Sequence, residues 1–260
     1  MVSEIVTARV KSGVCTVTLA DEERRNALSV DLVADLMAAL DEAEADPSVR
    51  VIVLTNTGSV FCAGADLTER TGRAKGSDPA KAFAPSDLFA RFVRSPKPYV
   101  GRIAGHAVAG GTGLVAALDI SVVVDWAKMG FTEVRIGVAP AMISVLCLPK
   151  MQAADARAAL LRGNRFLAPE AARLGLINAA VPQADLDREV DSIVSDLVAG
   201  GPNALAATKQ LLAQVPSMDL DAAFEYTAKM SGELFRSPEG QEGMAAYLEK
   251  RPAAWIPTDT

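Results

Sequence analysis

The sequence predicts an α/β protein, with a layered core of strands and helices followed by a helical C-terminal region. Short β-rich runs alternate with stretches of helical periodicity up to about residue 130, which is the pattern of a layered core. Beyond about residue 150 the apolar positions repeat almost only at helical spacing. Half of the 260 residues are apolar, enough to bury the core of one large domain or of one domain with an appendage.

The first predicted elements are a hairpin and an amphipathic helix. Two β-rich runs, EIVTARV and VCTVTLA, flank the turn signal KSG and predict the hairpin. Residues 29–45 predict a helix, with Ser29 suited to cap its start and Pro47 just past its end. The apolar stripe of this helix consists of Leu28, Leu32, Leu36 and Leu40.

The middle of the chain predicts three buried strands and one helix. The runs RVIVLTN (50–56), PYVGRIAG (98–105) and ISVVVDWA (120–127) are short and apolar, as buried strands are. The stretch GGTGLVAAL (110–118) predicts a helix between the last two. The polar, Gly- and Pro-rich residues 68–86 predict a mobile loop.

The C-terminal third is predicted to be an all-helical appendage. Several stretches after residue 150 have helical periodicity. They are ARAALLRG, PEAARLGL, DREVDSIVSDLVAG, NALAATKQLLAQV and the run from Leu220 to Lys250.

The charge of the chain argues against a nucleic-acid partner. The formal net charge is −6 and the sequence pI is about 5.0, so a phosphate-binding surface is not expected. Lys and Arg are scattered, and their densest groups, at Arg24-Arg25, Lys97 and Lys250-Arg251, do not form a basic block.

The cysteine and hydropathy patterns indicate a cytoplasmic protein without a membrane span. Cys15, Cys62 and Cys147 are widely spaced, with neither a metal-ligand spacing nor a disulfide framework, which fits a reducing compartment. The start MVSEIVTARV lacks the pattern of a signal peptide. Residues 103–124 approach membrane length, but Asp119 and four glycines favour a buried helix followed by a strand.

Two turns rich in small residues, SVFCAGADL (59–67) and GHAVAGGTGL (105–114), offer exposed backbone to a ligand. Taken alone, either turn is better explained as an ordinary strand-to-helix connection. The second lacks the Lys-Ser/Thr ending of a P-loop, and no GxGxxG occurs in the required frame, so nucleotide binding is disfavoured. Two such turns suit an oxyanion hole, in which backbone N–H groups stabilise a developing negative charge. A helix beginning near Gly110 adds its positive dipole end.

The candidate acid or base beside such a hole is Glu133. His106 is the only histidine, and no GxSxG motif supplies a nucleophilic serine to pair with it. Cys62 is adjacent to the first turn, although a small thiol more often serves packing. Glu133 lies among apolar residues of KMGFTEVRIGVAP, where burial would raise its pKa toward general acid/base use. A salt bridge to Arg135 is an equally good interpretation of that stretch alone.

Together these motifs resemble the enoyl-CoA hydratase/isomerase (crotonase) family. FCAGADL, GHAVAGGTGL and AKMGFTEVRIGVAP occur in the family's order and at its separations. Further similarity lies in RRNAL (24–28), LLRGNRFLAPEAARLGLINAAVP (160–182) and EGMAAYLEKR (242–251), so the resemblance covers essentially the whole chain. It implies a spiral of ββα units at residues 1–195 and a C-terminal helical trimerisation region at 196–260, assembled as a homotrimer or a dimer of trimers.

The resemblance also implies a site for an acyl-CoA thioester. The thioester carbonyl would lie between the backbone N–H groups of Ala63 and Gly110. Residues expected near coenzyme A are Arg24, Ala65 and Asp66, with Tyr247 and Lys250 reaching it from a neighbouring subunit. Coenzyme A is part of the substrate, so no metal and no other cofactor is implied.

One position departs from the family pattern. Typical hydratases of the family carry two glutamates, of which the later matches Glu133, while the earlier falls on Gly113, a substrate-site position that here cannot transfer a proton. A single carboxyl suits a Δ3,Δ2-enoyl-CoA isomerase, whereas a hydratase would need another group, a water or the substrate's own carboxylate in place of the second acid.

The residues that make up the motifs favour a hydratase. FCAGADLTER resembles methylglutaconyl-CoA hydratases of leucine breakdown, which indicates a short or branched 2-enoyl-CoA substrate. The lysine-rich helix with which some of those enzymes bind RNA has no counterpart here. An isomerase, another crotonase-type reaction and a catalytically degenerate acyl-CoA-binding protein remain the alternatives.

Overall fold

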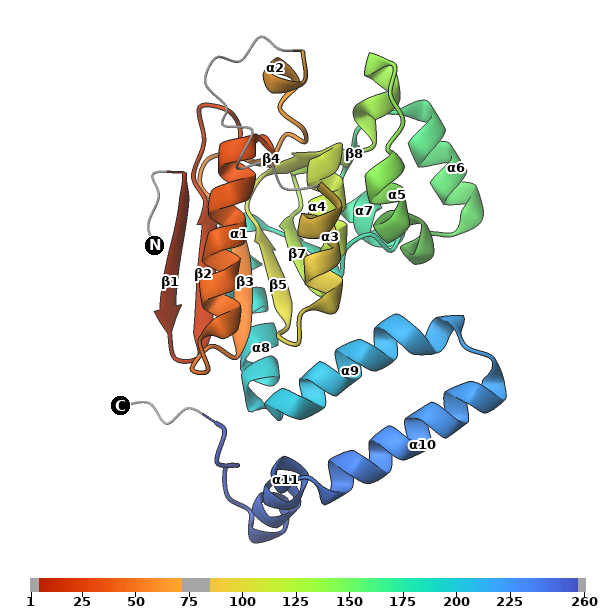
Figure 1. Cartoon of the computed structure of the whole chain (residues 1–260). Coiled ribbons are helices and arrows are strands. Elements are labelled where there is room, and N and C mark those ends of the chain that lie inside the picture. The colour runs from red at the N-terminus through yellow and green to blue at the C-terminus, as the bar shows by residue number, and fades with distance from the viewer. Residues whose placement is uncertain (1–4, 72–84, 257–260) are drawn as a thin grey trace.

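A computed structural model of the chain describes residues 5–71 and 85–256 and shows two β-sheets surrounded by helices (Figure 1). The larger sheet has the strand order β1-β2-β3-β5-β7-β10, and the smaller one has the order β4-β6-β8-β9. The α/β class expected from the sequence is therefore confirmed.

The larger sheet begins with the predicted hairpin and continues with parallel strands. The first two strands pair antiparallel, and each later neighbour is parallel. All six residues of the third strand are buried, as expected for a strand covered on both faces. The strands are β1 (Val6–Lys11), β2 (Val14–Leu19), β3 (Val51–Asn56), β5 (Tyr99–Ile103), β7 (Ile120–Val124) and β10 (Ala179–Val181).

The smaller sheet receives one strand from each of three successive units. In each unit the chain forms a strand of the larger sheet, then a strand of the smaller sheet, then helix, and this repetition is the spiral of ββα units. These three strands are β4 (Val60–Cys62), β6 (His106–Val108) and β8 (Lys128–Gly130). A fourth strand, β9 (Phe166–Leu167), comes later in the chain and completes the smaller sheet.

The helices of the core include the one predicted from the leucine stripe. Its N-cap is Ser29, whose side chain accepts a hydrogen bond from the Leu32 N–H, and its leucines at 32, 36 and 40 are buried. The core helices are α1 (Val30–Ala45), α2 (Leu67–Arg70), α3 (Pro85–Arg94), α4 (Gly110–Ala117), the 3-10 helix η2 (Thr132–Ile136), α5 (Ala141–Cys147), α6 (Ala153–Arg162) and α7 (Ala168–Arg173).

Two predictions about local structure are corrected. The C-terminal third is not all helical, because it contains two strands: β9 belongs to the smaller sheet and β10 to the larger one. The expected loop at 68–86 is helical at both ends, in α2 and α3, and its middle, 72–84, lies outside the described residues.

The last four helices differ in how closely they pack against the sheets. They are α8 (Leu186–Ala199), α9 (Pro202–Gln214), α10 (Leu220–Arg236) and α11 (Pro238–Glu249), so the run expected from Leu220 to Lys250 is broken where Ser237 caps the helix that Pro238 starts. The expected division after residue 195 falls inside α8, which packs against β5 and β7. Figure 1 shows α10 and α11 apart from the sheets, and none of α10's residues, all of them described, is buried.

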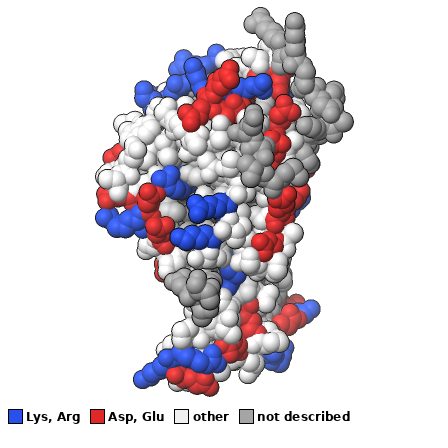
Figure 2. All heavy atoms as spheres, turned by 90° about the vertical axis from the view of Figure 1, so that its left-hand side faces the viewer, with Lys and Arg blue, Asp and Glu red and all other residues white. Residues whose placement is uncertain are grey.

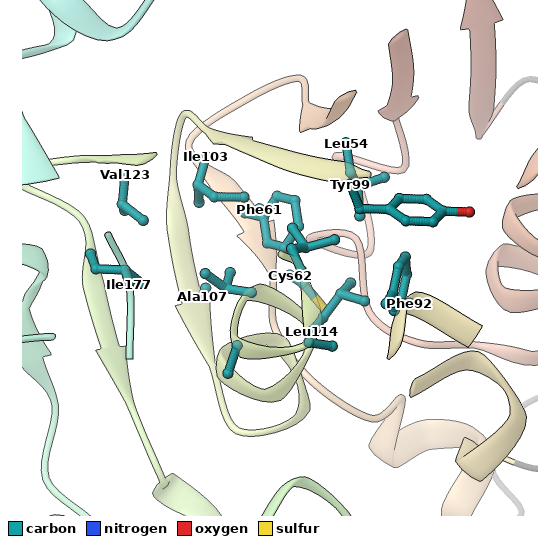
Figure 3. Packing of buried hydrophobic residues seen from close by; sticks show 14 of the residues in the cluster. Leu54, Phe61, Cys62, Phe92, Tyr99, Ile103, Ala107, Leu114, Val123 and Ile177 are labelled. Atoms are coloured by element: carbon teal, nitrogen blue, oxygen red, sulfur yellow. The ribbon is translucent and has the colours of Figure 1, made fainter. Parts of the chain in front are cut away.

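The interior is a continuous apolar core that reaches the two glycine-rich turns. Figure 3 shows Phe61 and Cys62 of β4 packed near Leu114 of α4, and Tyr99 beside Phe92. On the β1 side of the molecule, acidic and basic side chains are interspersed without one continuous basic surface (Figure 2). Within residues 5–71 and 85–256, no helix has the length and hydropathy of a membrane span.

Candidate active site

A cavity of about 1410 Å³ brings the predicted turns and Glu133 together. Its wall takes residues from the start of α1, from β4, β6 and α3, and from the segment between η2 and α5. Ala63, Gly110 and Glu133 all lie on this wall, although they are far apart in the sequence. The three residues expected to carry the chemistry therefore line one cavity.

Gly110 presents a free backbone donor at the start of α4. The preceding Ala109 has φ 52° and ψ −124° and provides no side-chain cap, so the first N–H groups of the helix have no capping partner. The first helical bond of this turn comes from the Gly113 N–H to the Ala109 carbonyl at 3.2 Å. Among the described residues the Gly110 N–H has no acceptor, and it lies at the positive end of the α4 dipole.

The glycines of the two turns allow their backbones to touch. A Cβ on Gly64, whose φ is +87°, would lie 3.1 Å from the Gly110 nitrogen. A Cβ on Gly111 would lie 2.2 Å from the Cys62 carbonyl oxygen. Larger residues would push the turns apart, which explains the glycine density: bare backbone is needed where the turns meet.

The Ala63 N–H, the second expected donor, has a partner in this structure. It donates to the Arg25 carbonyl at 3.2 Å, which is at the long end for such a bond. Arg25 and Asn26 have φ of 56° and 50°, and the Asn26 side chain fixes the turn by donating to the Val60 carbonyl at 2.8 Å. A ligand oxygen at Ala63 must therefore replace or share this acceptor.

Glu133 has the environment of a proton-transfer group. It lies in the first turn of η2, and its Oε2 is buried without a hydrogen-bond partner among the described residues. Burial raises the pKa of this carboxyl above its ordinary value. The alternative of a salt bridge to Arg135 is not observed within residues 5–71 and 85–256, and Arg135 instead donates to the Arg162 carbonyl at 2.8 Å.

Gly113, where typical hydratases carry the other glutamate, is covered by a side chain from α5. A Cβ placed on Gly113 would lie 2.1 Å from Cγ2 and 2.5 Å from Cβ of Ile143. Ile143 is 3 % exposed and lines the cavity, whereas Gly113 does not. The space of a second acid is thus filled by an apolar side chain.

The contacts of His106 and the burial of Cys62 indicate that both side chains serve the structure rather than the reaction. The His106 Nδ1 accepts the backbone N–H of Lys128 at 2.9 Å, and its ring meets Trp126 edge-on at 5.3 Å. Burial, with Lys128 and Arg165 nearby, lowers the pKa of His106. Burial raises the pKa of Cys62 to about 12, so this thiol is a packing group.

The cavity wall is basic although the chain is acidic. Among the described residues its charged side chains are five cations and two carboxylates. This excess suits an anionic ligand. The cations are Arg25, Arg70, Lys128, Arg135 and Arg165, and the carboxylates are Glu69 and Glu133.

The expected contacts to coenzyme A are only partly on the wall. Ala65 lines the cavity, and Arg25 lines it in place of the neighbouring Arg24, which is exposed. Asp66 is buried as the N-cap of α2, accepting from the backbone N–H groups of Thr68 and Glu69. Although burial opposes it, hydrogen bonds from Thr68 and Glu69 lower the pKa of Asp66.

Tyr247 and Lys250 do not line the cavity of their own chain. Tyr247 is 84 % exposed on α11, and Lys250 ends that helix with φ 55°. In Figure 1 α11 lies at the end of the molecule opposite β4 and β8. These residues could meet a cavity only in another copy of the chain.

Sequence reasoning missed the wall supplied by α3. Leu88 and Phe89 are buried and line the cavity, in a helix that the polar composition of 68–86 concealed. Their LFARFV pattern was the available signal. Among the described residues, no group of three or more His, Cys, Asp or Glu side chains is placed to hold a metal ion.

Comparison with known proteins shows the same family across the chain. Residues 9–257 match the family model described as enoyl-CoA hydratase/isomerase. A Thermus thermophilus protein named as an enoyl-CoA hydratase is 38 % identical, with 93 % of this chain and 97 % of that protein covered. Enoyl-CoA hydratase EchA19 of Mycobacterium tuberculosis is 31 % identical over 90 % of each chain.

Solved structures agree with this similarity. Pseudomonas aeruginosa AtuE has a TM-score of 0.88 at 31 % identity, with 97 % of this chain and 100 % of that chain covered. Human enoyl-CoA hydratase domain-containing protein 3 has a TM-score of 0.89 at 26 % identity, with 96 % and 100 % covered. The ββα spiral, the paired glycine turns and the full-length matches agree, and the chain belongs to the enoyl-CoA hydratase/isomerase family, the crotonase superfamily.

Proposed function

We propose that this protein is an enoyl-CoA hydratase that adds water to a 2-enoyl-CoA thioester. The observation that carries the proposal is the placement of one half-buried carboxyl, Glu133, in the same cavity as the unpaired Gly110 N–H at a helix start. A preorganised donor of this kind stabilises an enolate oxygen by a few kcal/mol in a dry site. The names of its relatives support the same reaction.

The proposed reaction proceeds through a thioester enolate. The substrate carbonyl oxygen binds at Gly110 and displaces the Arg25 carbonyl from the Ala63 N–H. Glu133 accepts a proton from water as the water oxygen bonds to C3 and the electrons of the double bond move onto the thioester oxygen. The protonated Glu133 then delivers a proton to C2, which restores the thioester and completes the addition. Neither a metal nor a redox cofactor takes part.

The basic wall and the C-terminal helices complete the proposal. In this proposal Arg25 and Arg70, which line the cavity, contact the phosphates and nucleotide of coenzyme A together with Arg24 and Ala65. The Asp66 carboxylate supports this region as the cap of α2. On α10 the apolar residues Leu220, Phe224 and Phe235 are 70 %, 67 % and 62 % exposed, which suits an interface in a trimer or a dimer of trimers. Tyr247 and Lys250 would then reach the coenzyme A of a neighbouring copy.

The filled position at Gly113 favours a second candidate, a Δ3,Δ2-enoyl-CoA isomerase. With Ile143 in the place of the other acid, Glu133 alone could remove a proton from C2 of a 3-enoyl thioester and return it to C4. Such a proton shuttle between carbons needs one carboxyl and no positioned water.

A panel of thioesters tests these proposals. Straight-chain 2-enoyl, 3-enoyl and 3-methylglutaconyl thioesters are assayed by the conjugated enoyl absorbance, with the product identified by mass. Loss of absorbance with a gain of one water supports the hydratase, and the 3-methylglutaconyl thioester tests the short, branched class. Gain of absorbance from the 3-enoyl substrate at constant mass supports the isomerase. Binding of coenzyme A thioesters without turnover of any of them would contradict both and leave a binding protein.

A further inference from the structure

A buried lysine of α9 joins the C-terminal helices to the wall of the cavity. Lys209 is 8 % exposed, and its ammonium group lies 2.6 Å from Asp119 Oδ2. It also donates to the carbonyl oxygens of Phe92 at 2.9 Å and Lys97 at 3.1 Å. All three donor sites of the ammonium therefore have partners, as a buried charge requires.

The Phe92 carbonyl belongs to the last turn of α3. Carbonyl groups in the last turn of a helix have no partner within it, and a cation there both satisfies them and opposes the negative end of the helix dipole. Lys209 thus caps the C-terminus of α3. The same helix places Leu88 and Phe89 on the cavity wall one turn earlier.

Asp119 extends the connection to α4. It follows the end of that helix, its Oδ2 accepts the Tyr99 N–H at 2.8 Å, and its own N–H donates to the Tyr99 carbonyl at 3.1 Å. The Lys209 ammonium lies 5.5 Å from the centre of the Tyr99 ring, which meets Phe92 edge-on at 4.9 Å (Figure 3). One side chain of α9 thereby contacts the last turn of α3 and a residue that follows α4, and both helices contribute residues to the cavity wall.

A second set of contacts attaches the last turn of α3 to α1. Arg91 pairs with Glu44 of α1 at 2.7 Å and with Asp41 at 2.6 Å, and the Tyr99 hydroxyl also hydrogen-bonds Glu44. The helix is held on one side by α1 and at its C-terminus by α9. Without the Lys209 contact, α3 would still be attached to α1 through Arg91. The helix could then shift about that attachment.

We propose that Lys209 is a positioning residue that sets the depth of the acyl pocket by holding α3, so that the C-terminal helices control which acyl chains the enzyme accepts. This inference rests on the proposed function, since it assigns the Leu88 and Phe89 wall to the acyl group. The lysine itself touches neither substrate nor reacting atoms.

The test replaces Lys209 with methionine, an unbranched side chain one atom shorter, which removes the charge and the donors. Arg50→Met is the matched control, because Arg50 also donates to two carbonyls of the C-terminal region, Gly200 at 2.6 Å and Trp255 at 2.7 Å, without contacting α3. Both full-length variants are compared with the wild type in hydrogen exchange and in turnover of 2-butenoyl-CoA and 2-octenoyl-CoA.

We expect Lys209→Met to change the ratio of kcat/KM for the two thioesters by at least about threefold, since displacements of about 1 Å in a pocket wall suffice for larger effects. Amide exchange at residues 88–94 should rise in this variant and stay at the wild-type level in Arg50→Met. A uniform loss for both thioesters, or unchanged exchange in α3, would overturn the proposal.

A second variant, Asp119→Asn, and the use of both turnover and hydrogen exchange distinguish failure of this proposal from failure of the proposed function. If Lys209→Met does not fold, Asp119→Asn, which keeps an acceptor and removes the charge, should shift the ratio in the same direction and by less. A wild type without turnover of either thioester would count against the proposed function. The exchange comparison in α3 would still decide whether Lys209 positions that helix.

Discussion

The close approach of Gly113 and Ile143 leads to a prediction about stability. Whether Gly113→Ala stabilises or destabilises the protein should depend on the residue at position 143. Gly113 is within α4, where alanine is favoured over glycine by about 1 kcal/mol. Sterics oppose this gain, because the new Cβ would lie 2.1 Å from Ile143 Cγ2, and overpacking of this kind costs about 1–3 kcal/mol. Gly113→Ala should therefore destabilise the protein by about 1 kcal/mol net.

Removing the obstructing side chain should reverse that sign. Ile143→Gly removes both the Cγ2 and the Cβ that obstruct the space, and it costs more than the ~2–5 kcal/mol of an Ile→Ala cavity because glycine also disfavours the helix. In this background the nearest atom of residue 143 to the new Cβ is its Cα at 3.6 Å, an ordinary contact distance, so Gly113→Ala should stabilise by about 1 kcal/mol. The two substitutions would then be coupled by about 2 kcal/mol, within the range seen for residues in contact.

Thermal unfolding of the wild type, both single variants and the double variant measures this coupling. At one protein concentration, each kcal/mol corresponds to about 2–4 °C in Tm for a chain of this size. Gly113→Ala should lower the Tm of the wild type and raise that of Ile143→Gly. The same shift in both backgrounds would show that Ile143 does not fill the space of a side chain at 113, and would refute the reasoning.

Three further predictions concern the carboxyl and the Gly110 turn. Because burial raises the pKa of Glu133, its ionised form opposes folding. Glu133→Gln should raise the Tm at neutral pH, and the gain should disappear below the ordinary glutamate pKa of about 4.3, where the wild type is protonated in both states. Equal Tm differences at both pH values would contradict this. Ala109→Gly should stabilise by about 1 kcal/mol, since strain of about 1–3 kcal/mol at φ 52° exceeds the entropic cost of glycine; a lower midpoint in urea would count against the strain. Gly110→Pro, which lacks the N–H, should lower kcat by about 10²–10³, whereas Gly110→Ala, which keeps it, should lose much less; similar losses in both would exclude the amide as the cause.

The features predicted correctly from the sequence are those set by local chemistry. The hairpin follows from a turn between β-rich runs, and α1 follows from a leucine stripe with Ser29 before it. The two glycine turns and Glu133 were identified from residue types that such sites require; residues of both line one cavity, and their roles in a reaction stay a prediction.

The features that were missed depend on contacts between distant segments. Ile143 fills the space at Gly113 from a different helix, and no local pattern connects these positions. The Ala63 N–H is engaged by the Arg25 carbonyl through a turn with two residues at positive φ, which sequence alone did not indicate. Polar neighbours concealed α3, whose Leu88, Phe89 and Phe92 are buried.

Turnover by Glu133→Gln is the most direct test of the central claim that one carboxyl performs the proton transfers beside the oxyanion hole. Single-turnover rates are measured with the thioester that the wild type converts best, alongside the Kd of a saturated acyl-CoA. We predict a loss of about 10²–10⁴ in rate with the Kd unchanged, because the amide keeps the shape of the carboxyl and removes its proton transfer. A variant that retains the wild-type rate would show that another group moves the proton.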